Sequence, residues 1–454
     1  MHIEQIYTGC LAQASYYIES DHEAIIIDPI RDSSIYINLL KQRKATLKYV
    51  LETHFHADFV SGHIELQRLT DCEIIFGPNA KTAYDIIGSK HEEKFSFGNL
   101  NIKVLHTPGH TLESVCYLLL SNDNRPHSVF TGDTLFIGEV GRPDLAVNSN
   151  MKSEDLAALL YDSLHNILMQ LPDHVIVYPG HGAGSACGKN ISLEKQSTIG
   201  DQKKFNYALQ TMSKAEFVKL VLDGISPAPK YFQHDVSMNR DGYDSMSTVL
   251  KKSLQKLEFQ DIQNAIKKDV VLLDVRMPDD FEKGFIPKSI NIGKTGMFAP
   301  WVGNIVTPNS AILLVCYPHE EREVILRLGR IGYHNIIGYT YGTADWQSKQ
   351  GLIHNIETIH LTDECLNPNK NIKVIDVRKE VELKLGFVQD SIHIPLSQLT
   401  ANLDQISKSD DYLIYCAGGY RSMIACSLLK SKGYNRVRNI YGGFSEISKN
   451  IKHS

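Results

Sequence analysis

Residues 53–59 of the chain read Thr-His-Phe-His-Ala-Asp-Phe, or THFHADF, directly after the apolar run KYVLE. The stretch almost matches the metal-binding sequence THxHxDH, in which the last histidine is a ligand of a two-metal site. Phe59 occupies that last position. The stretch therefore predicts a metal site at the end of a strand, and it raises the question of what a site without that ligand does.

Other strand-like runs in the first half of the chain also end in turns that carry His or Asp. The turn TPGH supplies His110, TGD supplies Asp133 and YPGH supplies His181. Imidazole and carboxylate groups are the natural protein ligands of Zn, Fe and Mn. A single histidine in such a turn would be an ordinary surface or hydrogen-bonded residue, but four such clusters in this order predict a metal centre.

Composition narrows the class of protein. A chain of 454 residues predicts two to three domains, and 43% hydrophobic with 22% charged residues is typical of a globular protein. The 47 basic and 52 acidic residues form no long run of either sign, so we expect no nucleic-acid partner. Since no apolar segment reaches membrane-spanning length and the first residues resemble no signal peptide, we expect a cytoplasmic protein without a membrane partner.

The second half contains an internal repeat. VVLLDVRMPDDFEKGFIPKSINI, from Val270, is similar to IKVIDVRKEVELKLGFVQDSIHI, from Ile372, and each copy continues to an apolar strand that ends in a cysteine, Cys316 or Cys416. Alternating strands and helices predict two α/β units with mostly parallel sheets. The predicted domains span residues 1–254, 255–355 and 356–454.

Cys416 is the predicted nucleophile of the second copy. The following loop, Ala417 to Arg421, has backbone N–H groups that can point at the sulfur, and a helix N-terminus and an arginine both stabilise a thiolate. Such settings lower a cysteine pKa to about 3.5–7.5. The alternative is a buried, inert cysteine. The predicted substrate-binding residues of this loop are Ala417, Gly418, Gly419, Tyr420 and Ser422.

The spacing of this loop predicts its substrate class. Arg421 follows Cys416 after four residues, one fewer than in the C-x5-R signature of phosphate-cleaving cysteine enzymes. The loop is therefore expected to be too small for phosphate and to hold one sulfane sulfur.

The first copy departs from this pattern. YPHEER after Cys316 restores the C-x5-R spacing to Arg322, but Glu320 and Glu321 would repel an anion and the loop has no glycine. We therefore predict an inactive copy that serves as a scaffold or a subunit contact.

The ordered motifs THxHxD, TPGH, TGD and PGH are similar to those of the metallo-β-lactamase superfamily, whose αββα sandwich holds metals between the edges of two sheets. The DVR strand followed by the cysteine loop resembles a rhodanese sulfurtransferase domain, with Asp376 and Arg378 in its structural signature. The resemblance implies an α/β fold class: an N-terminal metallo-β-lactamase αββα sandwich followed by two rhodanese-like α/β domains.

Within this superfamily, glyoxalase-type hydrolases use two metals, and Phe59 removes one ligand of the second. The remaining set favours one metal, held by His54, His110 and Asp133 as the facial triad of a non-haem Fe(II) oxygenase. We therefore expect one Fe(2+) ion per N-terminal domain. The alternative is drift at Phe59 in a site that still binds two metals weakly. Three residues become candidates for orienting ligands or handling protons: His56, Asp58 and His181.

Two further residues match one branch of the superfamily. GEVGRPDL looks like the GxxGRxD segment of persulfide dioxygenases, in which the arginine, here Arg142, helps to bind the thiol-bearing substrate. Its guanidinium can hold a carboxylate through two hydrogen bonds. Tyr178 matches a family tyrosine near the iron. The alternatives are a surface ion pair for Arg142 and a packed ring for Tyr178.

The whole chain resembles the bacterial persulfide dioxygenase-rhodanese fusion proteins of sulfide detoxification. The resemblance implies that a low-molecular-weight persulfide reacts with O2 at Fe(II) to give sulfite. Cys416 would take a sulfane sulfur from a second persulfide and pass it to sulfite, giving thiosulfate, and the fusion would raise the local sulfite concentration. It also implies a homodimer or homotetramer.

Two other functions remain open. One is a dinuclear zinc thioester hydrolase of the glyoxalase II type fused to a sulfur-carrier domain, and the other is a persulfide sensor that relies on Cys416 alone. Cys187, in HGAGSACGK, is either a sulfur acceptor beside the metal or an ordinary loop cysteine. The eight cysteines show no paired spacing, which favours reduced thiols.

Overall fold

A computed structural model describes residues 1–147, 151–225, 227–360 and 372–450. The chain divides into two compact units. The first contains Met1–Ser247 and Leu328–Gly332, and the second contains Thr248–Arg327 and Tyr333–Ser454. The predicted domain boundaries at 254/255 and 355/356 stay predictions.

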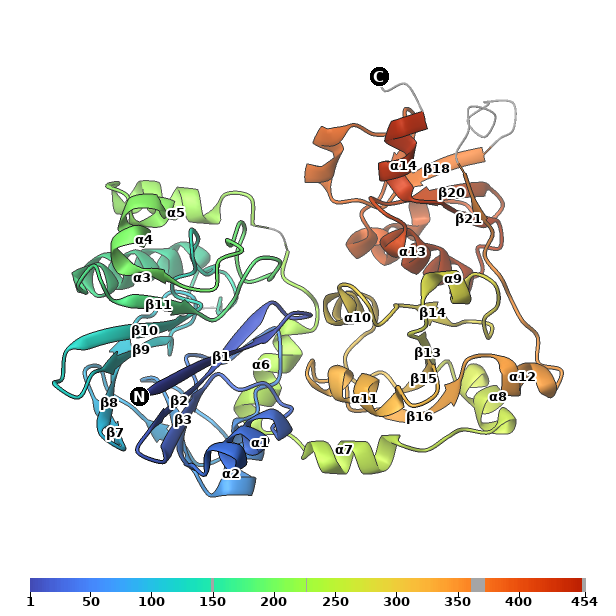
Figure 1. The fold of residues 1–454 in the computed structure, drawn as a ribbon. Coiled ribbons are helices and arrows are strands. Elements are labelled where there is room, and N and C mark those ends of the chain that lie inside the picture. The colour runs from blue at the N-terminus through green and yellow to red at the C-terminus, as the bar shows by residue number, and fades with distance from the viewer. Residues whose placement is uncertain (148–150, 226, 361–371, 451–454) are drawn as a thin grey trace. The chain divides into compact units, whose positions relative to one another are not determined.

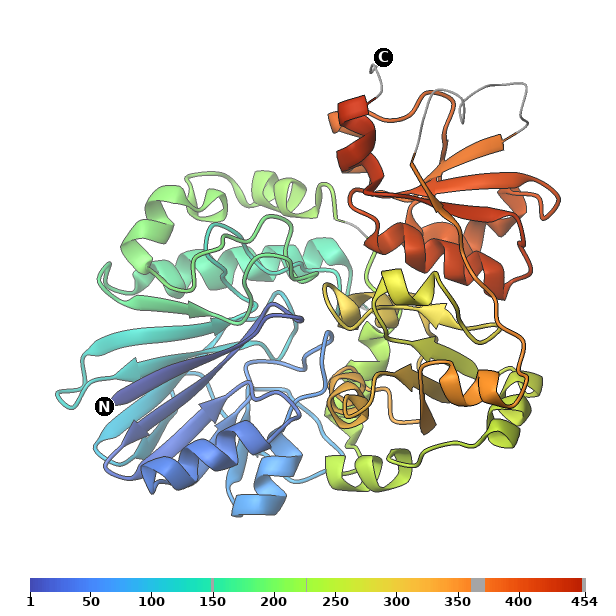
Figure 2. The ribbon, with the colours of Figure 1, turned by 45° about the vertical axis from the view of Figure 1, so that its right-hand side comes forward.

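The first unit is a four-layer sandwich of two sheets between two layers of helices (Figures 1 and 2). One six-stranded sheet has the order β1(His2–Thr8), β2(Gln13–Ser20), β3(Glu23–Ile27), β4(Thr46–Leu51), β5(Glu73–Phe76), β6(Ile87–Gly88). The other has the order β12(Ser197–Thr198), β11(Ile176–Pro179), β10(Pro126–Gly132), β9(Val115–Leu120), β8(Leu100–His106), β7(Lys94–Phe97).

Helices cover the outer face of each sheet. Those beside the first sheet are α1(Ser34–Arg43) and α2(His63–Thr70), and those beside the second are α3(Ser153–Asn166), α4(Ile199–Phe205) and α5(Lys214–Leu222) (Figure 1). Two short 3-10 helices are η1(Leu168–Gln170) and η2(Tyr207–Leu209). The chain then continues through α6(Phe232–Asp241) and α7(Met246–Ser253).

Strand β9, with the sequence VCYLLL, shows why this sequence forms a central strand. Every residue of it is buried, and successive side chains of a strand point to opposite faces of the sheet. Tyr117 and Leu119 enter the apolar core between the two sheets, whereas Cys116 and Leu118 enter the core under α3. A strand buried on both faces therefore reads as a continuous apolar run, as the sequence predicted.

A short segment from the second half of the sequence, Leu328–Gly332, belongs to the first unit. The amide of Val60, next to THFHADF, donates to the carbonyl of Arg330 at 2.7 Å. The guanidinium of Arg31, which is fully buried, donates to the carbonyl of Gly329 at 3.0 Å. These contacts join the loop of the predicted metal site to residues about 270 positions later, which no local sequence pattern indicates.

The second unit contains two parallel sheets with the same strand order. The first copy has β14(Ile290–Asn291), β13(Val271–Asp274), β15(Ile312–Cys316), β16(Ile336–Tyr341). The second copy has β19(Ile392–His393), β18(Ile372–Asp376), β20(Asp411–Tyr415), β21(Val437–Ile440), with β17(Thr358–Ile359) added at the edge. The shared order confirms the repeat predicted from the two DVR stretches.

Helices complete both copies. The first has α8(Phe259–Lys267), α9(Pro278–Phe281), α10(Phe298–Ile305), α11(Glu321–Gly329) and α12(Ala344–Ser348). The second has the 3-10 segments η4(Glu380–Leu385) and η5(Leu396–Gln405) and the helices α13(Tyr420–Ser431) and α14(Gly443–Asn450). None of the helices in the described ranges combines the length and the apolar character that a membrane crossing requires.

Candidate metal centre and cysteine loop

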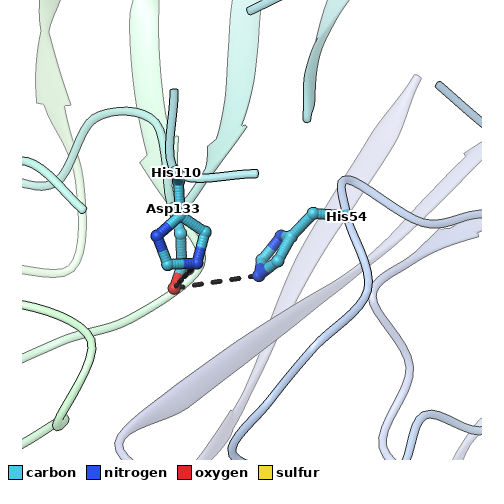
Figure 3. A group of neighbouring side chains, drawn as sticks. All are labelled: His54, His110 and Asp133. Carbon is cyan, nitrogen blue, oxygen red and sulfur yellow. Dashed lines mark ion pairs between the residues drawn. The ribbon is translucent and has the colours of Figure 1, made fainter. Parts of the chain in front are cut away.

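The three predicted metal ligands meet at the ends of three strands. His54 lies just after β4, His110 in the turn after β8, and Asp133 directly after β10. The Oδ2 atom of Asp133 is 3.5 Å from Nε2 of His110 and 3.9 Å from Nε2 of His54 (Figure 3). All three side chains are buried, and their ligand atoms lie within 4.8 Å of one another.

Hydrogen bonds fix the orientation of both imidazoles. Nδ1 of His110 lies 2.8 Å from the carbonyl oxygen of Arg142, which can only accept. Nδ1 of His54 lies 2.9 Å from Oγ1 of Thr53, whose own proton goes to Asp28 Oδ2 at 2.8 Å. Nδ1 therefore carries a proton in both rings, and Nε2 is the ring nitrogen that faces the centre and could bind a metal.

The charges of this group fit a divalent cation. Burial, followed by the neighbouring His56, His110 and His181, lowers the pKa of His54 well below its usual value, so the ring is neutral and able to bind a metal. Both oxygens of the Asp133 carboxylate are buried without a hydrogen-bond partner. A buried and unpaired carboxylate is costly, and a bound cation would compensate that cost.

A second group faces the other oxygen of Asp133. Nε2 of His181 lies 3.5 Å from Asp133 Oδ1 and 3.5 Å from Asp58 Oδ2, and it has no hydrogen-bond partner. The ligand atoms of Asp58, His181 and Cys187 lie within 4.8 Å of one another. Burial, followed by Asp58 and Asp133, raises the pKa of the Cys187 thiol well above its usual value. The only signal for Cys187 in the sequence is weak: it follows His181 in the same glycine-rich stretch.

His56 lies in a separate buried cluster. Its Nε2 is 3.1 Å from Asp28 Oδ1 and 3.3 Å from Glu52 Oε2. Burial opposes the charged ring, but these carboxylates raise the pKa of His56 well above its usual value. Asp28 and Glu52 are not among the residues predicted from the sequence, although EAIIID ends in Asp as the other strand-end clusters do.

Phe59 is fully buried, and its ring lies 4.3 Å from the ring of His56 at an interplanar angle of 30°. A phenyl ring offers no ligand atom. The position of the missing histidine is therefore filled by an apolar group packed against the cluster.

The structure does not bring the side chains of Arg142 and Tyr178 into the triad. Arg142 donates from Nε and Nη2 to Asp144 at 2.6 and 2.7 Å, so it holds a carboxylate of its own loop. Its amide donates to the carbonyl of Cys187 at 3.0 Å. The Tyr178 ring stacks on Phe130 at 5.2 Å in the core between the sheets. The substrate-binding role of both side chains stays a prediction.

One backbone amide of the Cys416 loop points at the sulfur. Cys416 directly follows β20, and its Sγ accepts a hydrogen bond from the amide of Gly419 at 3.1 Å and donates to Ser422 Oγ at 3.6 Å. Gly419 has a φ of 103°, a conformation that favours glycine, and α13 begins at the next residue.

The remaining loop residues have other contacts. The carbonyl of Ala417 accepts from Ser445, the space beside Gly418 is open, and the Tyr420 hydroxyl donates to the Gly293 carbonyl of the first copy at 2.8 Å. Arg421 donates to both carboxylate oxygens of Glu382, at 2.6 and 2.7 Å. Glu382 is not among the residues predicted from the sequence, because it lies 39 positions before Arg421.

The first copy lacks this arrangement. Cys316 is fully buried, and burial, followed by Glu321 and Glu320, raises the pKa of its thiol to about 12. Among the described residues the cysteines are unpaired, and Cys365 lies outside the described residues.

Comparisons with known proteins agree with this architecture. Residues 8–181 match the family model of the metallo-beta-lactamase superfamily, and residues 258–349 and 362–450 match that of the rhodanese-like domain. The chain is 31% identical over 232 residues to the probable hydroxyacylglutathione hydrolase glo2 of Schizosaccharomyces pombe, covering 44% of this chain and 85% of that protein. It is 30% identical over 220 residues to the mitochondrial persulfide dioxygenase ETHE1 of Homo sapiens, covering 48% and 78%.

One solved structure matches most of the chain. The crystal structure of a metallo-beta-lactamase from Staphylococcus aureus subsp. aureus COL has a TM-score of 0.66 and 29% identity, and the match covers 75% of this chain and 99% of that chain. The chain therefore belongs to the metallo-β-lactamase superfamily, and two rhodanese-like domains follow its metallo-β-lactamase domain.

Proposed function

We propose that this enzyme oxidises low-molecular-weight persulfides with O2 in its first unit and transfers sulfane sulfur in its second. His54, His110 and Asp133 would hold one Fe(2+) ion, and one persulfide, one O2 and one water would give sulfite, the free thiol and two protons. The observation that carries the proposal is the buried triad of two imidazoles and one carboxylate without a hydrogen-bond partner, together with Phe59 at the position where the motif has a second-metal ligand. The similarity to persulfide dioxygenase ETHE1 supports it.

The residues around the triad would prepare the site for this chemistry. Bound Fe(II) would supply open coordination positions for O2 and substrate. Thr53 and the carbonyl of Arg142 hold the two imidazoles in one tautomer, and the buried ring of Phe59 excludes water from the adjoining position.

The Cys416 loop would carry out the sulfur transfer. The Gly419 amide donates to Sγ of Cys416 and α13 begins at the next residue, an arrangement suited to a negatively charged sulfur. The thiolate attacks the outer sulfur of a persulfide, so that an S–S bond forms at Cys416 and the thiol leaves with the electron pair of the broken bond. Sulfite then attacks the outer sulfur of the Cys416 persulfide, which gives thiosulfate and returns the Cys416 thiolate.

The test is oxygen uptake by the Fe(II)-loaded chain supplied with glutathione persulfide, with sulfite and thiosulfate quantified. Wild type and Cys416→Ser are both expected to consume oxygen, and the product of the variant is expected to shift from thiosulfate to sulfite. Absence of oxygen uptake at confirmed iron occupancy would contradict the dioxygenase proposal.

A second candidate function is a dinuclear zinc thioester hydrolase. It is favoured by the group Asp58, His181 and Cys187 at the second oxygen of Asp133, because Cys187 would then replace the ligand lost at Phe59. The similarity to a hydroxyacylglutathione hydrolase also supports it. This candidate predicts two zinc ions per chain in the wild type and one per chain in Cys187→Ser. It also predicts thioester hydrolysis without oxygen. A metal content of one per chain in both proteins would exclude it.

A further inference from the structure

The guanidinium of Arg421 is already occupied by an anion. Its two terminal nitrogens donate to the two carboxylate oxygens of Glu382, in the parallel geometry that arginine also uses for external oxyanions. The side chains of Arg421 and Glu382 are 17% and 24% exposed, so solvent and small anions can reach the pair.

Glu382 is fixed in this position from a second side. One of its carboxylate oxygens accepts from the amide of Lys379 at 2.9 Å, at the start of η4. The hydrogen bonds from Arg421 hold the pKa of Glu382 below its usual value, so the carboxylate is ionised at neutral pH.

Arg421 also lies within electrostatic reach of the reacting sulfur. The ion pair with Glu382 raises the pKa of Arg421, and a negative charge on Cys416 raises it further in spite of burial. An anion that approaches the Cys416 persulfide would therefore meet a cation whose charge Glu382 neutralises.

We infer that Glu382 is a specificity-determining residue of the second rhodanese copy, because it competes with anionic acceptors and donors for the guanidinium of Arg421. This inference rests on the sulfur transfer proposed above. Sulfite and thiosulfate carry oxygens that fit the guanidinium as a carboxylate does, so each must displace Glu382 to bind there. A neutral thiol acceptor needs no such displacement, and the pair therefore favours neutral acceptors over oxyanions.

The experiment measures transfer from the Cys416 persulfide of the full chain to sulfite and to dithiothreitol, a neutral thiol. In Glu382→Gln the KM for sulfite is expected to fall about fivefold, because the partly exposed carboxylate of Glu382 no longer competes with sulfite for the guanidinium of Arg421. The kcat is expected to change little. The kinetics with dithiothreitol are expected to stay the same. Gln at this position still accepts from the Lys379 amide, so the start of η4 is retained.

Glu380→Gln is the matched control, because it removes the same charge from the same 3-10 segment at an exposed position. It is expected to leave both KM values unchanged. An unchanged or raised KM for sulfite in Glu382→Gln would overturn the inference and make the ion pair a support for Arg421. If Glu382→Gln does not fold, Glu382→Ala replaces it, and the KM for sulfite is again expected to fall.

The competition between Glu382 and an oxyanion can also be measured with thiosulfate as the sulfur donor. Thiosulfate as the donor transfers its outer sulfur to the Cys416 thiolate and releases sulfite, and dithiothreitol then removes that sulfur as hydrosulfide while it is oxidised to its disulfide. The KM for thiosulfate is also expected to fall about fivefold in Glu382→Gln. The thiosulfate assay distinguishes the inference about Glu382 from the proposed function, because it does not require sulfite to be the acceptor. An unchanged KM for thiosulfate in Glu382→Gln would overturn the inference about Glu382 and leave the proposed function untouched.

Discussion

The two rhodanese-like copies share one framework and differ in the residues after one cysteine. In both, an arginine two positions after an aspartate pairs with it at 2.6 Å, Arg276 with Asp274 and Arg378 with Asp376. In both, the same arginine donates to the carbonyl of a glycine eight residues later. This buried pair ties the end of a central strand to the following loop and is therefore a property of the fold.

The chemistry differs in the turn that follows the last residue of β15 or β20. Cys416 is followed by Gly418 and Gly419, and the Gly419 amide donates to the sulfur. Cys316 is followed by Glu320 and Glu321, and its thiol has a pKa raised to about 12. Sheet order and ion pair are the same in the two copies, whereas the surroundings of the cysteine differ. The fold therefore depends on the strands, and we expect the reactivity to depend on a few loop residues.

The largest expected effect separates the two cysteines. Cys416→Ser is expected to reduce sulfur transfer from thiosulfate to dithiothreitol at least about a thousandfold, because a hydroxyl is a far weaker nucleophile than a thiolate. Cys316→Ser is expected to change the rate less than about twofold. Equal losses in the two variants, measured under the same conditions, would break the comparison.

The shared ion pairs are expected to matter equally. Asp376→Asn leaves the buried Arg378 without its charge partner, and Asp274→Asn does the same to Arg276. Each change is expected to lower the free energy of unfolding by about 3 kcal/mol. Urea denaturation of the full chain measures this, and a loss below about 1 kcal/mol in either copy would show that the pair is not part of the common framework.

The next effect concerns the backbone of the active loop. Gly419→Ala places a side chain on a backbone with φ of 103°, and no neighbouring atom lies close to the new methyl group. The strain therefore comes from the backbone alone and is expected to lower kcat about tenfold by moving the amide that faces the sulfur. Gly418→Ala, at a position that is also open but has no positive φ, is the control and is expected to keep its rate.

The smallest effect concerns pH. Because Glu320 and Glu321 disfavour the Cys316 thiolate, the double change to Gln is expected to lower the pKa of that thiol by about one unit. The thiolate would then form at a lower pH than in wild type, although burial, the largest cause, keeps the pKa above its usual value. The pH dependence of thiolate absorbance, compared with Cys316→Ser as the blank, measures the change. An unchanged pH dependence would show that burial alone raises the pKa of the Cys316 thiol.

The sequence predicted those features that local patterns control. Apolar runs ending in His or Asp indicated the strands and a metal site at their ends, and the resemblance to the superfamily selected His54, His110 and Asp133 as the triad. His54 follows a strand of one sheet and the other two residues follow strands of the second sheet, so the triad depends on how the two sheets pack. The same alternation explains Tyr178: its neighbour Val177 lies in the core under α3, so Tyr178 must face the core between the sheets.

The features that the sequence analysis missed depend on contacts between distant residues. Glu382 reaches Arg421 across 39 positions, and Asp28 reaches His56 from a different strand end. Cys187 was noticed, but its place beside Asp58 depends on how two loops pack. In each case the side chain is ordinary in its own segment, and only the tertiary fold gives it a partner.

The segment Leu328–Gly332 determines how this chain can be divided in the laboratory. A truncated protein that stops near residue 254 would contain the whole triad but would lose the carbonyls of Arg330 and Gly329. The amide of Val60 and the guanidinium of Arg31 would then have lost these partners beside the loop that carries His54. We therefore expect a fragment that keeps this distant segment, through a covalent link or as an added peptide, to be more stable than one that ends near residue 254.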